Sequence, residues 1–184
     1  MGRVIVFLAN GFEEVEALTV VDYLRRVDIQ VDTVSITDEK RVKGAHDIEV
    51  IADKTIEELV HLEDYTTVVI PGGMPGASNL RDDERVTSIV KEIYEKQKLV
   101  AAICAGPIVL QKAGILDDKL VTSFPGFEDQ LTGTVYTGKN VERDGNIITA
   151  RGPYFAVDFA IEIVDYLLGM QKADELKESI LYTK

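Results

Sequence analysis

Runs of apolar residues recur along the chain, and each ends at a turn or at small residues. The runs are continuous rather than alternating, which is typical of strands covered on both faces, as in a parallel sheet. The pattern predicts strands at 3–9, 30–36, 66–70 and 99–103, with shorter ones at 48–51 and 120–122. A hairpin is expected within 135–150, where Asp144-Gly145 is a typical two-residue turn.

Helical periodicity occupies the segments between these strands. The clearest case follows Asp82-Asp83-Glu84, where apolar residues recur every three or four positions up to Tyr94. Further helices are predicted at 12–26, 56–62, 105–112, 156–168 and 172–180. In the first of these, the residues expected to face the core are Val15, Leu18, Val21 and Leu24. The alternation predicts an α/β three-layer sandwich with a mostly parallel central sheet and a small β-hairpin, in a single domain over 1–184.

Composition narrows the range of partners. The chain has 20 Lys and Arg against 32 Asp and Glu, a net charge of −12, so neither nucleic acid nor an anionic membrane is an expected partner. No apolar run approaches the roughly 20 residues of a membrane span. There is 1 Cys and there are 2 His, which excludes a disulfide framework and cysteine-rich metal sites. We therefore expect a cytoplasmic protein with no metal and no other cofactor.

The single cysteine, Cys104, lies at the end of the most apolar predicted strand, just before a predicted helix. A nucleophile flanked by small residues between a strand and a helix has the layout of a nucleophile elbow, and Ala102, Ala105 and Gly106 are small. Amides at a helix N-terminus would stabilise a thiolate there. The alternative is a buried apolar cysteine with no chemical role.

Two other loops follow predicted strands at the same edge of the sheet, where ligands bind in open α/β folds. The loop with Gly72 and Gly73 has no nucleotide-binding spacing, and it is either an oxyanion hole or a tight turn. The loop at 10–16 holds Glu13, Glu14 and Glu16. Glu13 and Glu14 suit an exposed helix start, whereas Glu16 lies beside apolar positions and could turn inward to share a proton with Cys104.

Both histidines precede Cys104. Amidotransferases with a Cys-His-Glu triad and α/β-hydrolases place their histidine after the nucleophile, so both classes are disfavoured. His61 is expected to be exposed to solvent. His46, which precedes a strand, either lies near a pocket or is a surface residue.

Four stretches carry a resemblance to a known family: G-F-E-E-V-E at 11–16, V-V-I-P-G-G at 68–73, A-A-I-C-A-G-P at 101–107 and T-A-R-G-P at 149–153. Together they resemble the DJ-1/ThiJ/PfpI superfamily over nearly the whole chain, most closely its DJ-1 branch. The resemblance implies a flavodoxin-like fold, of the class I glutamine amidotransferase-like type, and a homodimer.

The resemblance also implies roles for single residues. Cys104 matches the reactive, oxidisable cysteine, and Glu16 matches the acid that hydrogen-bonds it. Gly73 and Ala105, with Gly72 beside them, match the amides of an oxyanion pocket. The positions where a dimer interface borders the site are matched by Arg26, Gly152 and Pro153.

Two positions depart from the family pattern. Phe124 stands where human-type members have a histidine, which removes an assisting base, although bacterial-type relatives can also carry Phe there. His46 stands where relatives usually have arginine, which weakens a site cation or makes it dependent on pH. The PfpI-type peptidases have a histidine directly after the cysteine, and this chain has Ala105.

The resulting hypothesis is a cysteine-dependent enzyme of glyoxalase III or protein deglycase type. Its substrates would be methylglyoxal, related α-oxoaldehydes or glycated groups, in defence against oxidative and carbonyl stress. The alternative is a sensor of oxidative stress or a redox-regulated chaperone that acts through oxidation of Cys104 to a sulfinate. A cysteine peptidase and a thiazole-biosynthesis protein, as relatives are labelled, have less support, because no Cys-His pair and no phosphate cradle is evident.

Overall fold

The structure, a computed structural model, describes residues 2–183. Its centre is a seven-stranded sheet in the order β10-β11-β7-β6-β1-β2-β5, parallel throughout except for the β10–β11 hairpin. The strands of this sheet are β1 (Arg3–Leu8), β2 (Val31–Ser35), β5 (Lys54–Thr55), β6 (Tyr65–Ile70), β7 (Leu99–Ile103), β10 (Val141–Asp144) and β11 (Ile147–Ala150). The mostly parallel sheet and the hairpin at Asp144-Gly145 are confirmed.

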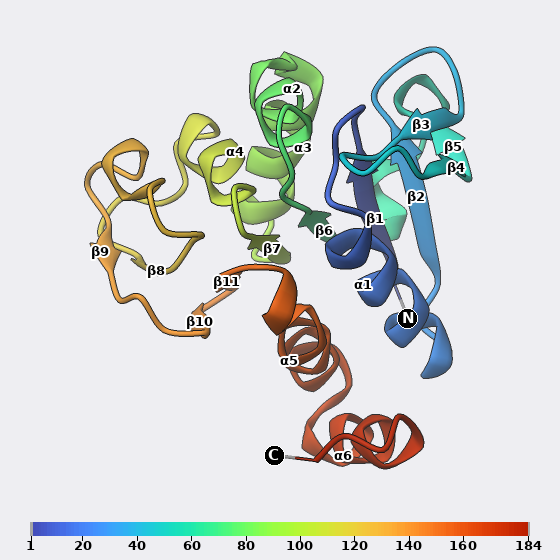
Figure 1. Cartoon of the computed structure of the whole chain (residues 1–184), viewed down its shortest axis with the longest axis vertical. Helices are drawn as coiled ribbons and strands as arrows, with labels where there is room; N and C mark the ends of the chain where they lie inside the picture. The colour runs from blue at the N-terminus through green and yellow to red at the C-terminus, as the bar shows by residue number, and fades with distance from the viewer. Residues whose placement is uncertain (1, 184) are drawn as a thin grey trace.

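Helices cover both faces of the sheet, as the continuous apolar strands predict (Figure 1). One apolar core joins the sheet to α1 (Glu14–Arg26), α5 (Ala156–Leu168) and α6 (Met170–Ser179). The other joins it to α2 (Gly76–Asp82), α3 (Glu84–Glu95) and α4 (Pro107–Lys112). Alternate residues of one strand enter opposite cores: Val4 and Val6 pack with the first set of helices, and Ile5 and Phe7 with the second. None of the described helices is long and apolar enough to cross a membrane.

Two small two-stranded sheets flank the central one. One pairs β3 (Arg41–Lys43) with β4 (Glu49–Ile51) in an antiparallel hairpin, and the other pairs β8 (Leu120–Val121) with β9 (Val135–Tyr136). The strand β3 and the helix α2 are absent from the predicted elements, because neither has a periodic apolar run. The helix predicted at 56–62 is wrong: two short 3₁₀ turns, Ile56–Glu58 and Leu62–Asp64, occupy this segment.

The predicted inward face of α1 is wrong for two of its four residues. Val21 and Leu24 are buried, but Val15 is 51% exposed and Leu18 38% exposed. Ala17 and Val20 take their place against the sheet, together with Glu16. Because α1 is apolar on two sides, its periodicity does not decide which side faces the core. The second apolar side is therefore left on the surface.

The strand order places three loops together. From β1 the chain runs to β2 on one side and later to β6 on the other, so the sheet has a topological switch point between β1 and β6. The carboxyl ends of β1, β6 and β7 lie at one edge of the sheet because these strands are parallel neighbours. The loops that contain Gly72 and Cys104 meet the first turn of α1, which carries Glu16, at this edge.

Candidate active site

Cys104 lies in a sharp turn between β7 and α4. Its φ of 62° is in the left-handed region, which is uncommon for a residue with a side chain and is typical of a nucleophile elbow. Two backbone hydrogen bonds hold the turn: Cys104 N donates to Ala150 O (2.9 Å), and Phe124 N donates to Cys104 O (3.0 Å). The side chain is half-buried. The strand-to-helix layout thus presents the sulfur beyond the edge of the sheet.

Glu16 brings a carboxyl group to this sulfur from the first turn of α1. The residue is fully buried, and its Oε2 accepts a hydrogen bond from Gly72 N (2.7 Å). Among the described residues, its Oε1 has no hydrogen-bond partner. The carboxyl lies beside the Cys104 side chain, because both pack against Gly72, and each group shifts the pKa of the other, so the structure brings together the two residues that the sequence pairs.

Gly72 is the contact point of the three loops. A Cβ at this position would lie 2.6 Å from Cys104 Cβ and 2.6 Å from Glu16 Oε2, closer than real Cβ atoms approach. Gly72 O accepts a hydrogen bond from Glu13 N (2.9 Å), which ties the loop to the start of α1. The neighbouring Gly73 has a φ of +84°, a conformation that favours glycine. The Gly-Gly pair therefore allows the nucleophile, the acid and the loop after β6 to pack together.

The environment of the pair raises both pKa values. Burial raises the pKa of Glu16 to about 7, although hydrogen bonds from Gly72 and Cys104 act in the opposite direction. Burial, followed by the Glu16 carboxylate, raises the pKa of Cys104 to about 12, and the amides of Ala105 and Gly73 offset only part of this rise. The expected low thiol pKa at a helix N-terminus is therefore wrong. The helix α4 begins only at Pro107, and an adjacent carboxylate disfavours a second negative charge.

His46 lies beside Glu13 and Glu14, at the start of α1. Its Nδ1 is 2.9 Å from Glu14 Oε2 and 3.5 Å from Glu13 Oε1, and its backbone N donates to Glu14 Oε1 (2.7 Å). These carboxylates raise the pKa of His46, the hydrogen bond to Glu14 contributing most. Glu14 is buried rather than exposed as predicted, and Glu13 is half-buried.

Among residues 2–183, Glu13, Glu14 and His46 form the group whose donor atoms could hold a metal ion, since all lie within 4.8 Å of one another. The carboxyl group of Glu14 already accepts hydrogen bonds from His46. The sequence carries no metal-site signature for these residues.

The other residues that the sequence assigns to the site lie in two different regions of the structure. Phe124, Gly152 and Pro153 line one hollow, and Phe124 N donates a hydrogen bond to Cys104 O. Arg26 is not at Cys104 within the chain: it lies at the far end of α1, about 15 Å from Glu16 at a helical rise of about 1.5 Å per residue. There Arg26 Nε donates to Asp22 Oδ2 (2.8 Å).

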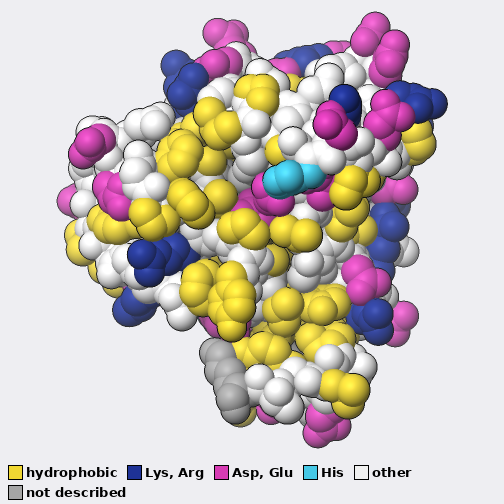
Figure 2. All heavy atoms as spheres, in the orientation of Figure 1, with side chains coloured by type: hydrophobic (Ala, Val, Ile, Leu, Met, Phe, Trp, Pro, Cys, Tyr) yellow, Lys and Arg dark blue, Asp and Glu magenta, His cyan; other side chains and the backbone are white. Residues whose placement is uncertain are grey.

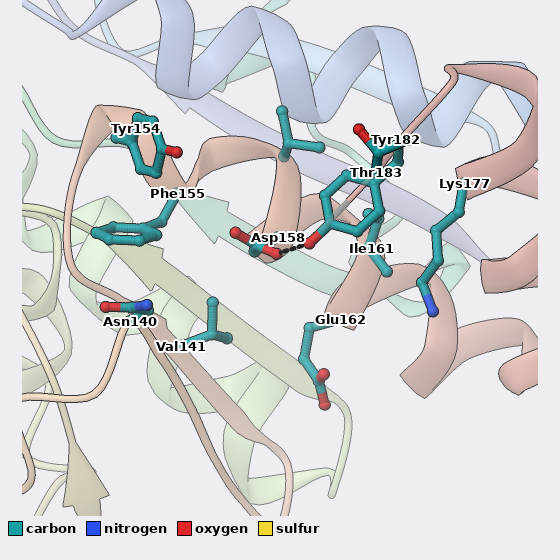
Figure 3. Close-up of a pocket in the computed structure, with 11 residues that line it drawn as sticks. Asn140, Val141, Tyr154, Phe155, Asp158, Ile161, Glu162, Lys177, Tyr182 and Thr183 are labelled. Carbon is teal, nitrogen blue, oxygen red and sulfur yellow. Dashed lines mark hydrogen bonds between the residues drawn. The ribbon is translucent and has the colours of Figure 1, made fainter.

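A groove that Cys104 does not line lies between β10, α5 and the chain after α6 (Figure 3). Its volume is about 900 Å³, and a hydrogen bond from Tyr182 to Asp158 crosses it. It contains no cysteine and no histidine. We therefore place the candidate chemistry at Cys104 and Glu16.

Three comparisons bear on the family. The family model described as the DJ-1/PfpI family matches residues 2–166. The chain is 34% identical to the Parkinson disease protein 7 homolog of Danio rerio, over 97% of this chain and 96% of that protein. It is 38% identical to protein DJ-1alpha of Drosophila melanogaster, over 97% of this chain and 83% of that one.

Solved structures agree with these relatives. Oxidized DJ-1 from Toxoplasma gondii superposes with a TM-score of 0.95 at 34% identity, over 100% of both chains. DJ-1beta from Drosophila melanogaster gives a TM-score of 0.94, also at 34% identity and over 100% of both chains. With the elbow cysteine and its buried glutamate in place, the chain belongs to the DJ-1/PfpI family.

Proposed function

We propose that the protein is a cysteine-dependent enzyme of glyoxalase III or deglycase type, which acts on α-oxoaldehydes such as methylglyoxal in defence against carbonyl and oxidative stress. The observation that carries the proposal is the position of the buried Glu16 carboxyl beside the Cys104 thiol. With a pKa of about 7, Glu16 is matched to proton transfer near neutral pH, in both directions. The nucleophile in this proposal is Cys104 Sγ, at the turn between β7 and α4.

The first step in this proposal is addition to the aldehyde. Glu16 takes the thiol proton as Cys104 Sγ forms a bond to the aldehyde carbon, and the carbonyl π electrons move to the oxygen. The amides of Gly73 and Ala105 point at this region, since both act on the sulfur in the resting site, and they would stabilise the oxyanion. The oxygen then receives the proton from Glu16, which gives a neutral hemithioacetal.

The second step is an internal oxidation and reduction. The Glu16 carboxylate removes the proton of the former aldehyde carbon, which gives an enediol as the hydroxyl proton passes from the oxygen of this carbon to the oxygen of its neighbour. Glu16 then returns its proton to the neighbouring carbon. The first carbon becomes a thioester and the second an alcohol carbon. Water hydrolyses the thioester and releases lactate and the free thiol. The sum is methylglyoxal plus water giving lactate, with no external oxidant. On an early glycation product, Cys104 would displace the glycated amine or thiol from the same carbon, and Glu16 would give its proton to this leaving group, which leaves the same hemithioacetal.

The test is lactate formation from methylglyoxal by the wild-type protein, before and after one equivalent of iodoacetamide. Because Cys104 is the only cysteine, this reagent alkylates one site, which intact mass verifies. We expect lactate from the untreated protein and almost none after alkylation. Lactate formation that is absent, or that is unaffected by alkylation, would contradict the enzyme proposal.

A redox sensor or redox-regulated chaperone is the second candidate, favoured by the same pair. Protonated Glu16 could donate a hydrogen bond to a Cys104 sulfinate, and a similar solved structure is an oxidized DJ-1. A selective gain of two oxygens at Cys104 under mild peroxide, with no lactate formed, would favour the sensor. In either role, a reducing cytoplasm would keep Cys104 as a thiol.

We also propose that the protein is a homodimer through the exposed apolar side of α1. Val15, Leu18, Ile48 and Ile51 are between 38% and 66% exposed, and Ile48 N contacts the Glu14 carboxylate, which joins the β3–β4 hairpin to α1. Figure 2 shows hydrophobic side chains gathered across this face. An antiparallel two-fold pairing of α1 would bring Arg26 of the partner subunit towards Glu13.

Leu18→Glu is expected to convert this dimer to a monomer, because it places a charge in the centre of the apolar side. Light scattering after size exclusion measures the mass. Leu181→Glu, at a position that is 86% exposed near the end of the chain, is the matched control and should stay dimeric. A wild-type protein that is monomeric at micromolar concentration would contradict the proposal.

A further inference from the structure

The direction of the Ala105 amide depends on the peptide bond that joins it to Cys104. This peptide is trans and planar, so its carbonyl and its N–H point in opposite directions, and holding one holds the other. Cys104 O accepts a hydrogen bond from Phe124 N (3.0 Å). The N–H on the other side of the same plane is the Ala105 amide, which acts on the Cys104 sulfur. The Phe124 amide therefore sets the direction of an oxyanion donor.

The Phe124 amide is held in the same way, through the peptide that it shares with Ser123. Ser123 is fully buried, and its carbonyl accepts a hydrogen bond from the Tyr136 hydroxyl (3.1 Å). Tyr136 lies in β9, outside the sheet that leads to the nucleophile. Two planar peptides thus connect the Tyr136 hydroxyl to the Ala105 amide.

Thr149 holds the beginning of the same segment, residues 122–124. Thr149 Oγ1 accepts a hydrogen bond from Thr122 N (2.9 Å), and both residues are fully buried. The next residue of β11, Ala150, accepts a hydrogen bond from Cys104 N (2.9 Å). The strand β11 therefore holds the elbow with its backbone and the segment 122–124 with a side chain. Thr149 opens the stretch T-A-R-G-P, and nothing in the reaction proposed above uses it.

A second buried threonine of the same sheet provides a comparison. Thr67, in β6, is also fully buried, but within residues 2–183 its Oγ1 has no hydrogen-bond partner. Valine has the shape of threonine and no polar side-chain atom to desolvate. Replacing Thr67 by valine therefore removes no hydrogen bond, whereas the same change at Thr149 leaves the buried Thr122 N without this acceptor.

The elbow needs support from its neighbours, because the left-handed φ of 62° at Cys104 costs free energy in a residue with a side chain. We propose that Thr149 and Tyr136 are positioning residues, which hold the segment 122–124 in place. The amide of this segment then keeps the Ala105 N–H turned towards the sulfur and towards the oxyanion that forms there. The inference rests on the proposed function only in taking Cys104 as the nucleophile and the Ala105 amide as its donor.

The test is the second-order rate of Cys104 alkylation by iodoacetamide in the native protein at pH 7.5. Iodoacetamide reacts with the thiolate, which the Ala105 amide stabilises. Loss of a hydrogen bond to a charged group lowers the thiolate fraction by about tenfold, and the greater nucleophilicity of the more basic thiolate offsets about threefold of this. We expect Thr149→Val and Tyr136→Phe each to slow alkylation by about threefold.

The sign of this change separates positioning from a general loss of structure. A loosened fold exposes the thiol to water and lowers the raised pKa of Cys104, so it speeds alkylation. Thr149→Ser, which keeps the hydroxyl, should restore the wild-type rate. Thr67→Val is the matched control and should leave the rate unchanged. Urea denaturation of each variant measures any change in stability separately.

Two results would overturn the proposal. One is an alkylation rate in Thr149→Val and Tyr136→Phe that equals or exceeds the wild-type rate, and the other is equal slowing in Thr67→Val. If Thr149→Val does not fold, Tyr136→Phe decides by the same criterion, since Tyr136 is only half-buried and loses a single oxygen.

This readout does not depend on turnover. If no lactate forms but the two variants slow alkylation, the proposed reaction fails and the positioning role stands. If lactate forms and the variants leave the alkylation rate unchanged, the reaction stands and the positioning role fails. For an active enzyme, kcat/KM for lactate formation should fall by about tenfold in both variants, a part of the roughly 10²-fold that removal of one oxyanion donor costs.

Discussion

Cys104→Ser is expected to lower lactate formation from methylglyoxal by about 10³-fold or more, towards the rate without protein. A hydroxyl proton is held far more tightly than a thiol proton, and a carboxylate with a pKa of about 7 cannot remove it at a useful rate. The shorter C–O bond also withdraws the nucleophile from the amides of Ala105 and Gly73. The measurement is kcat/KM for lactate formation at pH 7.5.

The same variant should fold normally. Serine tolerates the left-handed φ of 62° about as well as cysteine, and the side chain is only half-buried. We expect the free energy of unfolding to change by about 1 kcal/mol or less. Intact mass after peroxide should show no gain of two oxygens in this variant. Activity within tenfold of the wild type would contradict a cysteine nucleophile.

Much of the fold could be predicted because the apolar runs are short and continuous. The strand β7 begins and ends at the predicted residues, and α5 spans the predicted 156–168. In both elements, the local run or periodicity of apolar residues is enough to predict the type of element and its ends. The errors arise where local pattern is ambiguous: α1 is apolar on two sides, and only the tertiary fold decides that Val20 faces the sheet and Leu18 does not.

The site was predictable in part. The elbow at Cys104 and an inward Glu16 follow from sequence position at the edge of a parallel sheet. The function of Gly72 does not, because it depends on the simultaneous approach of Cys104 and of Glu16, a residue 56 positions away. The thiol pKa also depends on tertiary contacts: a helix start predicts stabilisation of a thiolate, whereas burial beside a carboxylate raises the pKa of Cys104.

Glu16→Gln is expected to change activity and stability in different ways. An amide neither takes up nor releases a proton near neutral pH, so lactate formation at pH 7 should fall by about 10²-fold, the usual contribution of a general acid–base group. In the wild type, Cys104 alkylation by iodoacetamide should rise with pH through about 7, as Glu16 becomes the base form. The variant should lose this inflection. An unchanged pH profile would contradict the role of Glu16 as the base.

Glu16→Gln should lower activity but raise the free energy of unfolding above neutral pH. The pKa of Glu16 is raised from 4.5 to about 7 on folding, so the folded state binds the proton more tightly than the unfolded state. Its favourable contribution is complete below pH 4.5 and is lost as pH rises through 7, by about 3 kcal/mol in total at 1.36 kcal/mol per pKa unit. Glutamine has no such titration, although its NH₂ group beside the sulfur costs about 1–2 kcal/mol.

Glu16→Gln should therefore be more stable than the wild type by about 1–2 kcal/mol at pH 8, and equal or less stable at pH 4.5. Urea denaturation at the two pH values measures the difference. Glu178→Gln, at an exposed position in α6, is the matched control and should show no pH-dependent gain. A variant less stable than the wild type at pH 8 would mean that Glu16 is not held at a raised pKa. The proton-transfer role rests on the same buried carboxyl, because the desolvation that destabilises the folded protein at high pH is what tunes this group to act near neutrality.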